Sequence, residues 1–200
     1  MNGEVLNDKE AFAYAFGQFA KVVTLKESDK EAFRSLFKVV RLRRKELLIR
    51  EGQVCKGDYY IVQGCLRSYY VDKDQIEHTT RLAVEGWWSG NLKSFLRQVP
   101  SEFNVVALED TMVLKVDRAD IEKLYQRAPV FERYFRILLQ NSLLSTQDRV
   151  SQHLSSSALD KYRQFRKRYP TLEQRVSQKD IASYLGITPA YLSRLRKNYR

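Results

Sequence analysis

The chain has 200 residues, 44% of them hydrophobic, and its 35 Lys and Arg outnumber 24 Asp and Glu to give a net charge of +11. This length and composition allow one or two compact cores and exclude a disordered chain, while two cysteines are too few for a disulfide scaffold. No apolar run approaches the roughly 18 residues of a membrane span, and the N-terminus lacks the features of a signal peptide, so we expect a soluble, cytoplasmic protein without a membrane partner.

The first predicted helix in chain order covers residues 29–37, where Phe33, Leu36 and Phe37 recur at helical spacing after Ser28, a candidate N-cap. From about residue 42 to residue 116 the pattern changes to short runs rich in β-branched and aromatic residues, which predict strands. These runs cover residues 47–51, 59–63, 65–71, 76–84 and 102–116, with predicted turns at 51–52, 56–58, 63–64, 72–74 and 85–86. The region is typical of an antiparallel barrel or sandwich.

Two helices are predicted after this region, a short one over residues 118–127 and a long one from residue 130 to about residue 153. The long helix carries an apolar stripe of Phe131, Phe135, Leu138, Leu139, Leu143 and Val150. Such a helix either packs on its own domain or pairs with its mate in a dimer. We favour a dimer helix with contacts through Phe131, Phe135, Leu138 and Leu139, because readers of DNA commonly bind two half-sites as dimers.

The C-terminal stretch from Ser177 to Lys197 predicts two short helices joined by a turn at Gly186. Ser177 and Thr188 are their N-caps, the second followed by Pro189 at the first helical position. The positions that pack the two helices together are Ile181, Ala182, Leu185, Ile187, Leu192 and Leu195. This layout is that of a helix-turn-helix DNA reader. With a preceding helical segment at residues 155–169 it forms a three-helix domain, and the printed chain leaves no residues for a wing after it.

Positive charge is concentrated in the same region. Residues 151–200 hold 11 Lys and Arg against 3 Asp and Glu, which leaves 24 against 21 for the rest of the chain. Such an excess is the footprint of a module that neutralises phosphates, although a solvated helix face with Arg163, Arg166, Lys167 and Arg168 would show the same charge. Beside the helix-turn-helix pattern, we favour nucleic acid.

The order of a β region, a long helix and a basic helix-turn-helix resembles the Crp/Fnr family of bacterial transcription regulators. The resemblance is carried by LLIREG at residues 47–52, DYYIVQGCLR at 58–67, EGWWSGNL at 85–92 and IASYLGITPAYLSRLRK at 181–197. It implies an α+β fold with a β-roll sensor at residues 1–129, a dimerisation helix at 130–153 and a DNA-binding domain at 154–200. It also implies a homodimer, double-stranded DNA and RNA polymerase as partners.

The chain departs from the family where cyclic-nucleotide binders hold the ligand. Their Gly-Glu-Leu triplet is here Gly90-Asn91-Leu92, and the stretch that should hold the phosphate-binding arginine is Ser101-Glu102-Phe103. Lys93 and Arg97 lie nearby, but on a stretch that precedes the pocket strand. Because burying a phosphate without a cation is costly, we predict that cyclic AMP is not a ligand.

A different small effector could occupy the β-roll instead. The candidate pocket consists of Trp87, Trp88, Gly90, Asn91, Leu92 and Phe103, since aromatic residues around a few polar groups are typical of ligand sites. Tryptophans beside a barrel are, however, usually core or dimer contacts. An orphan roll that serves dimerisation or protein contact therefore stays open.

Within the helix-turn-helix, the second helix places Pro189, Ala190, Tyr191 and Arg194 toward base edges in the major groove. The family resemblance assigns Arg194 to a base-contacting arginine. Backbone phosphates are assigned to Ser177, Gln178, Thr188, Arg196 and Lys197. The alternative is an architectural or weakly specific binder that uses its basic charge alone.

Catalysis, haem, iron–sulfur and metal chemistry find no support in the sequence. His78 and His153 are the only histidines, and Cys55 and Cys65 are expected to be ordinary reduced thiols. No phosphate-binding glycine loop or dinucleotide fingerprint occurs. We therefore predict no catalytic residue, no metal ligand and no cofactor.

Overall fold

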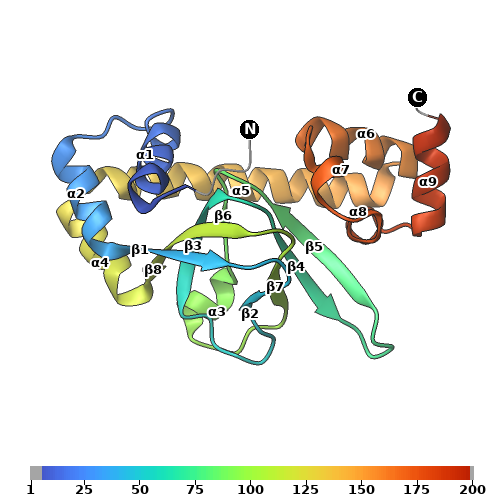
Figure 1. Cartoon of the computed structure of the whole chain (residues 1–200), viewed down its shortest axis with the longest axis horizontal. Helices are drawn as coiled ribbons and strands as arrows, with labels where there is room; N and C mark the ends of the chain where they lie inside the picture. Colours follow the sequence, from blue (N-terminus) through green and yellow to red (C-terminus); the bar gives the residue numbers. More distant parts are fainter. Residues whose placement is uncertain (1–5, 199–200) are drawn as a thin grey trace.

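The computed structural model of the chain describes residues 6–198, apart from the side chains of residues 152–154 and 198. Two antiparallel four-stranded sheets face one another, with helices at both ends and a long helix, α5, along the whole molecule (Figure 1). One sheet has the order β1-β8-β3-β6 and the other the order β2-β7-β4-β5. The expected mixed fold with an antiparallel β core is therefore present.

The strands follow the predicted runs closely. The first sheet contains β1 (Phe37–Leu42), β3 (Gly57–Gln63), β6 (Trp88–Ser89) and β8 (Thr111–Asp117). The second contains β2 (Leu47–Ile49), β4 (Leu66–Val71), β5 (Glu77–Ala83) and β7 (Asn104–Ala107). Strands β1 and β6 were not predicted. The turn predicted at residues 56–58 is wrong, because Gly57 and Asp58 begin β3 and pair with Asp117 and Val116 of β8.

Two helices precede the sheets, α1 (Asp8–Phe19) and α2 (Glu27–Leu36). Helix α1 was not predicted. Helix α2 starts before the predicted Ser28 cap, because the Lys26 amide donates to the Asp29 carboxylate at 2.8 Å and closes the first turn there. Phe37 does not end this helix but begins β1, where it pairs with Val116.

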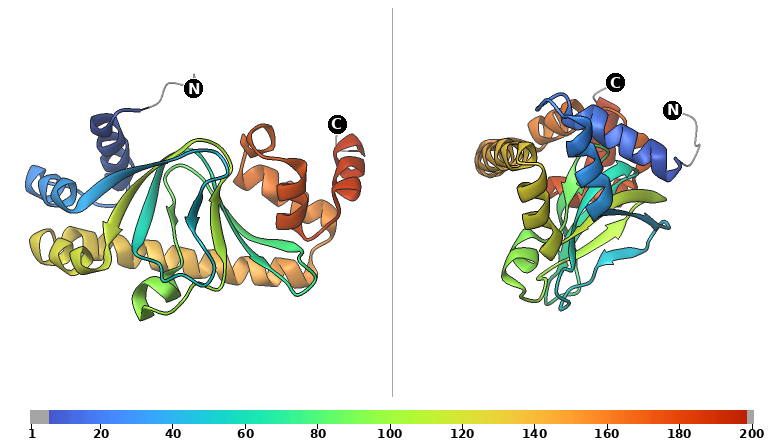
Figure 2. Two further views of the ribbon diagram at one scale, coloured as in Figure 1. Left: turned by 60° about the horizontal axis from the view of Figure 1, so that its bottom comes forward. Right: turned by 90° about the vertical axis from the view of Figure 1, so that its left-hand side faces the viewer.

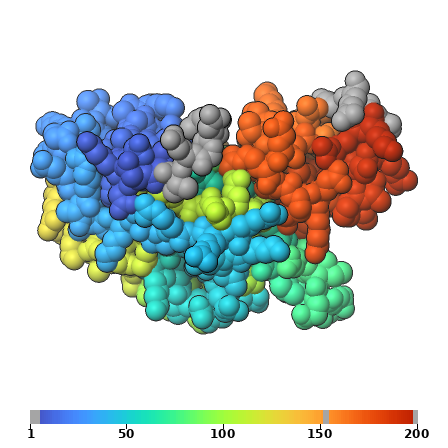
Figure 3. All heavy atoms as spheres, in the orientation of Figure 1, coloured from blue at the N-terminus to red at the C-terminus, as the bar shows by residue number. Residues whose placement is uncertain are grey.

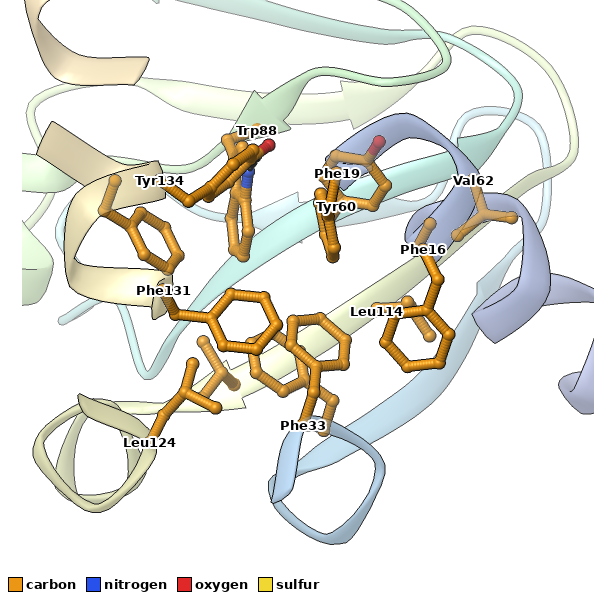
Figure 4. Close-up of a cluster of buried hydrophobic side chains, with 14 of the residues drawn as sticks. Phe16, Phe19, Phe33, Tyr60, Val62, Trp88, Leu114, Leu124, Phe131 and Tyr134 are labelled. Atoms are coloured by element: carbon orange, nitrogen blue, oxygen red, sulfur yellow. Dashed lines mark hydrogen bonds between the residues drawn. The ribbon is translucent and has the colours of Figure 1, made fainter. Parts of the chain in front are cut away.

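Buried aromatic side chains from six elements, α1, α2, β1, β3, β6 and α5, form the core that joins these helices to the first sheet (Figure 4). Phe33 lies at its centre, fully buried and stacked on Phe37 with ring centroids 3.6 Å apart. Phe19, Phe131 and Phe16 surround Phe33 at 5.3, 5.2 and 5.5 Å. The long helix is thereby fixed to the sandwich at its N-terminal end.

Helix α4 (Arg118–Arg127) has the predicted bounds, and α5 extends over Val130–Ser155. The right-hand view of Figure 2 looks along α5, which follows one outer side of the molecule. Phe131 and Phe135, predicted as dimer contacts, are buried in the aromatic core of their own chain. That part of the prediction is wrong, because the N-terminal turns of α5 pack inward. None of the helices in residues 6–198 is both long and apolar enough to cross a membrane.

Four helices follow α5, namely α6 (Ala158–Arg168), α7 (Leu172–Arg175), α8 (Gln178–Leu185) and α9 (Pro189–Asn198). Ser177 caps α8, and Gly186 takes a left-handed conformation with φ 69° between α8 and α9, as predicted. The short α7 was not predicted. Tyr162, Phe165, Ile181, Leu185 and Leu192 form the core of this unit.

This core also includes Cys65 and Leu82 from the sandwich, so the C-terminal helices do not enclose a core of their own. They cover the free edge of β5, and the β4–β5 hairpin (green) lies below them in Figure 3. The Ser183 hydroxyl accepts from Thr79 N at 2.9 Å and donates to Glu77 O at 3.0 Å, and the Tyr169 hydroxyl donates to Leu82 O at 2.9 Å. These side chains replace the missing neighbour strand.

A charged clamp reinforces this contact. The Arg175 guanidinium from α7 donates to Glu85 at 2.6 and 3.1 Å and to Glu109 at 2.5 and 3.1 Å. Burial alone would lower the pKa of Arg175, but the hydrogen bonds that its guanidinium donates to both carboxylates, together with their charges, raise this pKa overall. A second arginine, Arg67 of β4, is only 5% exposed and pairs with Glu77 at 2.7 Å and with Asp180 of α8 at 3.2 Å.

We expect Arg175→Gln to loosen the C-terminal helices from the sandwich, at a cost of about 1–2 kcal/mol, because it removes charge-assisted bonds from a partly exposed network. Hydrogen exchange of the α7 and α8 amides should rise. The control is Arg163→Gln, which removes an exposed pair with Asp160 within one helix. Equal exchange in both variants would show that the clamp does not hold the interface.

Candidate nucleic-acid interface and effector region

Helix α9 presents a polar and cationic face to solvent. Leu192 is fully buried and fixes the helix on α8, while Pro189, Ala190, Tyr191, Arg194 and Lys197 are exposed. The Arg194 guanidinium lies 5.5 Å from the Tyr191 ring centroid, a cation–π contact that orients both side chains. The residues predicted to face bases therefore lie together on the accessible side of one helix.

The residues predicted to contact phosphates are less uniform. Gln178 and Lys197 are exposed, as is Lys179, which sequence reasoning missed. The Ser177 hydroxyl donates to the Asp180 carboxylate at 2.6 Å and accepts from Asp180 N at 3.2 Å. The capping hydroxyl of Ser177 therefore already has a protein partner.

Arg196 and Thr188 are similarly occupied. Arg196 is half-buried with Nε 3.7 Å from the Glu173 carboxylate, and the Thr188 hydroxyl accepts from Tyr191 N at 3.2 Å. Both side chains stabilise the C-terminal helices themselves. A phosphate would have to compete with Glu173 for Arg196, whereas among the described residues no carboxylate lies within ion-pair distance of Lys197 or Lys179.

The stretch Gly90-Asn91-Leu92 begins the short helix α3 (Leu92–Arg97). Asn91 is buried and acts as the N-cap, with its carbonyl oxygen accepting from Ser94 N at 3.0 Å and its amide donating to the Ser101 hydroxyl at 2.9 Å. The Asn91 side chain thus holds together the stretch of residues 90–103, which we call the cassette. Its polar atoms bond to the protein itself.

The other residues of the predicted effector pocket do not converge. Trp88 is buried in the aromatic core, where its indole N–H donates to the Tyr134 hydroxyl at 3.3 Å. Leu92 is 48% exposed, and Phe103 packs against a different core cluster. Trp87 faces the C-terminal helices, with its ring 5.7 Å from that of Tyr169.

Charges around the cassette do not favour an anion. Lys93 is exposed and pairs with Glu102, and Arg97 is exposed on α3. Asp58 lies beside Gly90, where an added Cβ would come within 3.1 Å of its Oδ1. Burial raises the pKa of Asp58 to about 7.

Cavities occur elsewhere in the described part of the chain. One of about 660 Å³ lies beside β1 and β2 and is lined by Leu42, Ile49, Lys56, Tyr59 and Lys115 among others. Another, of about 300 Å³, lies between α5, α6 and α8. Trp87, Trp88, Gly90, Asn91, Leu92 and Phe103 line neither of them.

The remaining candidates for chemistry have structural surroundings. His78 lies on β5, half-exposed, with Nε2 2.6 Å from the Asp72 carboxylate and its ring stacked on Tyr70. Cys55 and Cys65 are free and buried, and burial raises the pKa of the Cys65 thiol to about 12. Within residues 6–198, no three His, Cys, Asp or Glu side chains are grouped so as to hold a metal ion.

Known proteins share both the domain and the arrangement. Residues 39–128 match the cyclic nucleotide-binding domain family. The global regulator CLP of Xanthomonas campestris, described as c-di-GMP responsive, superimposes with a TM-score of 0.67 at 17% identity over 87% of this chain and 91% of its own. FixK2 of Bradyrhizobium japonicum superimposes with a TM-score of 0.67 at 20% identity, over 82% of this chain and 84% of its own.

The catabolite activator protein of Thermus thermophilus gives a TM-score of 0.57 at 20% identity and covers 90% of this chain and 85% of its own. A comparison with curated protein sequences finds no match. The domain match and the shared fold over most of the chain agree with the motifs at residues 47–92. The fold of the chain is thus similar to that of these regulators, and its residues 39–128 match the cyclic nucleotide-binding domain family.

Proposed function

We propose that this protein is a DNA-binding transcription regulator of the Crp/Fnr type, which reads a two-fold-related operator as a homodimer through residues 188–198. The observation that carries the proposal is the exposed face of α9, where Arg194 and Tyr191 project together above a buried Leu192. A guanidinium so placed can donate two hydrogen bonds to guanine in the major groove. The Crp/Fnr-like fold supports this role for the helix.

The proposed dimer contact lies further along α5 than Phe131 and Phe135. Leu139, Leu143 and Val150 are 50%, 60% and 56% exposed, and successive residues on one helix face recur at this spacing. Leu138 packs toward the aromatic core, so it supports the helix from inside. Three large exposed apolar side chains on one outer face favour a second copy of the same helix as the partner.

The proposed regulator does not respond to cyclic AMP. The side-chain oxygen and nitrogen of Asn91 already form hydrogen bonds with Ser94 and Ser101. The charge of the nearby Lys93 is neutralised by Glu102. A cyclic phosphate placed there would meet a carboxylate. If the β core senses an effector, its chemistry differs from that of a cyclic nucleotide.

The competing proposal is a weakly specific or architectural DNA binder. The exposed arginines and lysines of α6 favour it, because they add attraction for any duplex. The two proposals differ in their dependence on base sequence, which the first experiment measures.

Arg194→Ala should weaken binding to the selected operator by about 1–3 kcal/mol and relax preference at one base pair in each half-site. Operators would first be selected from random duplexes, and affinities measured by fluorescence anisotropy at several salt concentrations. The control is Lys197→Ala, which should lower affinity equally for all sequences. An equal loss on random and selected duplexes for Arg194→Ala would favour the architectural binder.

Leu139→Glu combined with Leu143→Glu should convert the dimer to a monomer, because two charges would be buried against their own copies. Analytical ultracentrifugation reports the change. Leu96→Glu on α3, a residue of similar exposure at 53%, is the control and should leave the mass unchanged. A wild-type monomer at micromolar concentration would contradict the proposed interface.

Isothermal titration of the wild-type protein with cyclic AMP should give no binding in the micromolar range. Glu102→Arg removes the carboxylate, frees Lys93 and restores a cation in the cassette, so this variant should gain measurable affinity. Micromolar binding by the wild type would refute the assignment.

A further inference from the structure

The cavity of about 300 Å³ lies where the long helix meets the C-terminal helices. Asn141, Ser145 and Arg149 line it from α5, Phe165 and Arg168 from α6, and Tyr184 from α8. It therefore touches the proposed dimer helix and the first helix of the proposed reader at once. None of the residues assigned above to bases lies in it.

Its walls combine aromatic rings with guanidinium groups. The ring centroids of Phe165 and Tyr184 lie 5.9 Å apart, and the Arg149 guanidinium lies 5.3 Å from the Tyr184 centroid. Arg168 donates to the Ser145 hydroxyl at 2.9 Å and lies 4.7 Å from the centroid of Trp87. Planar rings beside cations are suited to stack a flat ligand that carries negative charge.

The arginines around the cavity lack close carboxylate partners. Across residues 6–198, no carboxylate lies within ion-pair distance of Arg149, Arg168 or Arg81, whereas Arg67 and Arg175 each hold two carboxylates. Arg81 lies behind the cavity, 5.8 Å from the Trp87 centroid. Burial lowers the pKa of Arg81, Tyr169 and Asp58 oppose this change, and the charges of Arg168 and Arg149 add to it.

Asp148 is the one acidic residue that lines the cavity, against Arg149, Lys161 and Arg168. Cations held close together in a partly enclosed space raise each other's electrostatic energy. An anion bound among them would relieve this repulsion, and the aromatic walls would contribute stacking. The cavity is thus complementary to a ligand that has both features.

A second copy of the chain is a poor occupant. The residues of α5 that line the cavity project roughly 80–180° away from Leu139 around the helix, at about 100° per residue; they are Asn141, Leu144, Ser145, Asp148 and Arg149. The stripe of Leu139, Leu143 and Val150 spans only about 40°. The proposed dimer contact and the cavity therefore use different faces of α5.

We propose that this cavity is a binding site for a small phosphorylated ligand with a planar ring, of the mononucleotide class, held by Arg149 and Arg168 and stacked on Tyr184. The site is distinct from the cassette at residues 90–103. Because it bridges α5 and α8, a bound ligand would change the free energy of moving the reader helices relative to the dimer helix.

The test is fluorescence anisotropy of N-methylanthraniloyl-AMP added to the full chain, with unlabelled AMP, GMP and inorganic phosphate as competitors. We expect saturable binding that AMP or GMP displaces more strongly than phosphate does. Combining Arg149→Gln with Arg168→Gln should weaken binding at least about tenfold, because two charge-assisted contacts are lost. Tyr184→Phe, which keeps the aromatic ring, should retain nucleotide binding.

The matched control combines Arg163→Gln with Arg166→Gln, which removes the same charge from the outer face of α6. It should leave nucleotide affinity within about twofold, since exposed charges are screened by salt. Thermal unfolding of both double variants establishes that each is folded. Absence of saturable binding by the wild type, or equal losses in the two double variants, would overturn the proposal.

DNA is the other anionic partner that these arginines could contact. Because we assign them to the ligand site, the Arg149 and Arg168 double variant should keep its affinity for duplex DNA without nucleotide. A loss of DNA binding in this variant, with no nucleotide binding by the wild type, would assign the two arginines to the DNA surface and overturn the ligand site. A failure of operator recognition in Arg194→Ala would leave the nucleotide result unaffected, so the two proposals fail separately.

Discussion

The arrangement of the C-terminal helices depends on the free edge of β5. The hydroxyls of Ser183 and Tyr169 bond to the backbone of this strand, and Leu82 from the same strand enters the core of the C-terminal helices. Arg175 adds two carboxylates from neighbouring turns. The direction of α9 is therefore set by the sandwich as well as by α5. The C-terminal helices thus contact the β core directly through β5, and not only through the long helix.

The arginines of this chain divide into two groups by what surrounds them. Arg67 and Arg175 each pair with two carboxylates across the contact between the sandwich and the C-terminal helices, so their charge is consumed within the protein. Arg194 and Arg149 lie over aromatic rings with no carboxylate pair among the described residues. Positive potential is thus available at the surface of α9 and in the cavity beside α5, which is where anionic partners are proposed.

Local signals in the sequence predicted much of the fold. Caps at Ser177 and Thr188 and the glycine at 186 define α8 and α9 because the groups that determine them lie within three residues of each other. Strand β6 could not be predicted in this way. It has only two residues, and its pairing with Tyr59 and Tyr60 depends on segments far apart in the chain. The unpredicted helix α1 likewise owes its place to packing on Phe33 and Tyr60.

The spacing of apolar residues in the sequence also could not predict whether an apolar stripe is covered by the same chain or left exposed. Phe131 and Leu139 belong to the same pattern on α5, yet the first is fully buried by the chain itself and the second is half-exposed. For the cassette, the resemblance to the Crp/Fnr family identified the missing arginine. The pairing of Lys93 with Glu102 and the cap formed by Asn91 are specific contacts that a single sequence does not reveal.

The covering of β5 has a further consequence for the handling of the protein. A sheet edge with unpaired N–H and C=O groups is a template for pairing with other chains. A fragment that ended within α5 would uncover this edge together with Leu82, and would tend to aggregate edge to edge. The C-terminal helices thus also shield this edge of the β core from pairing with other chains.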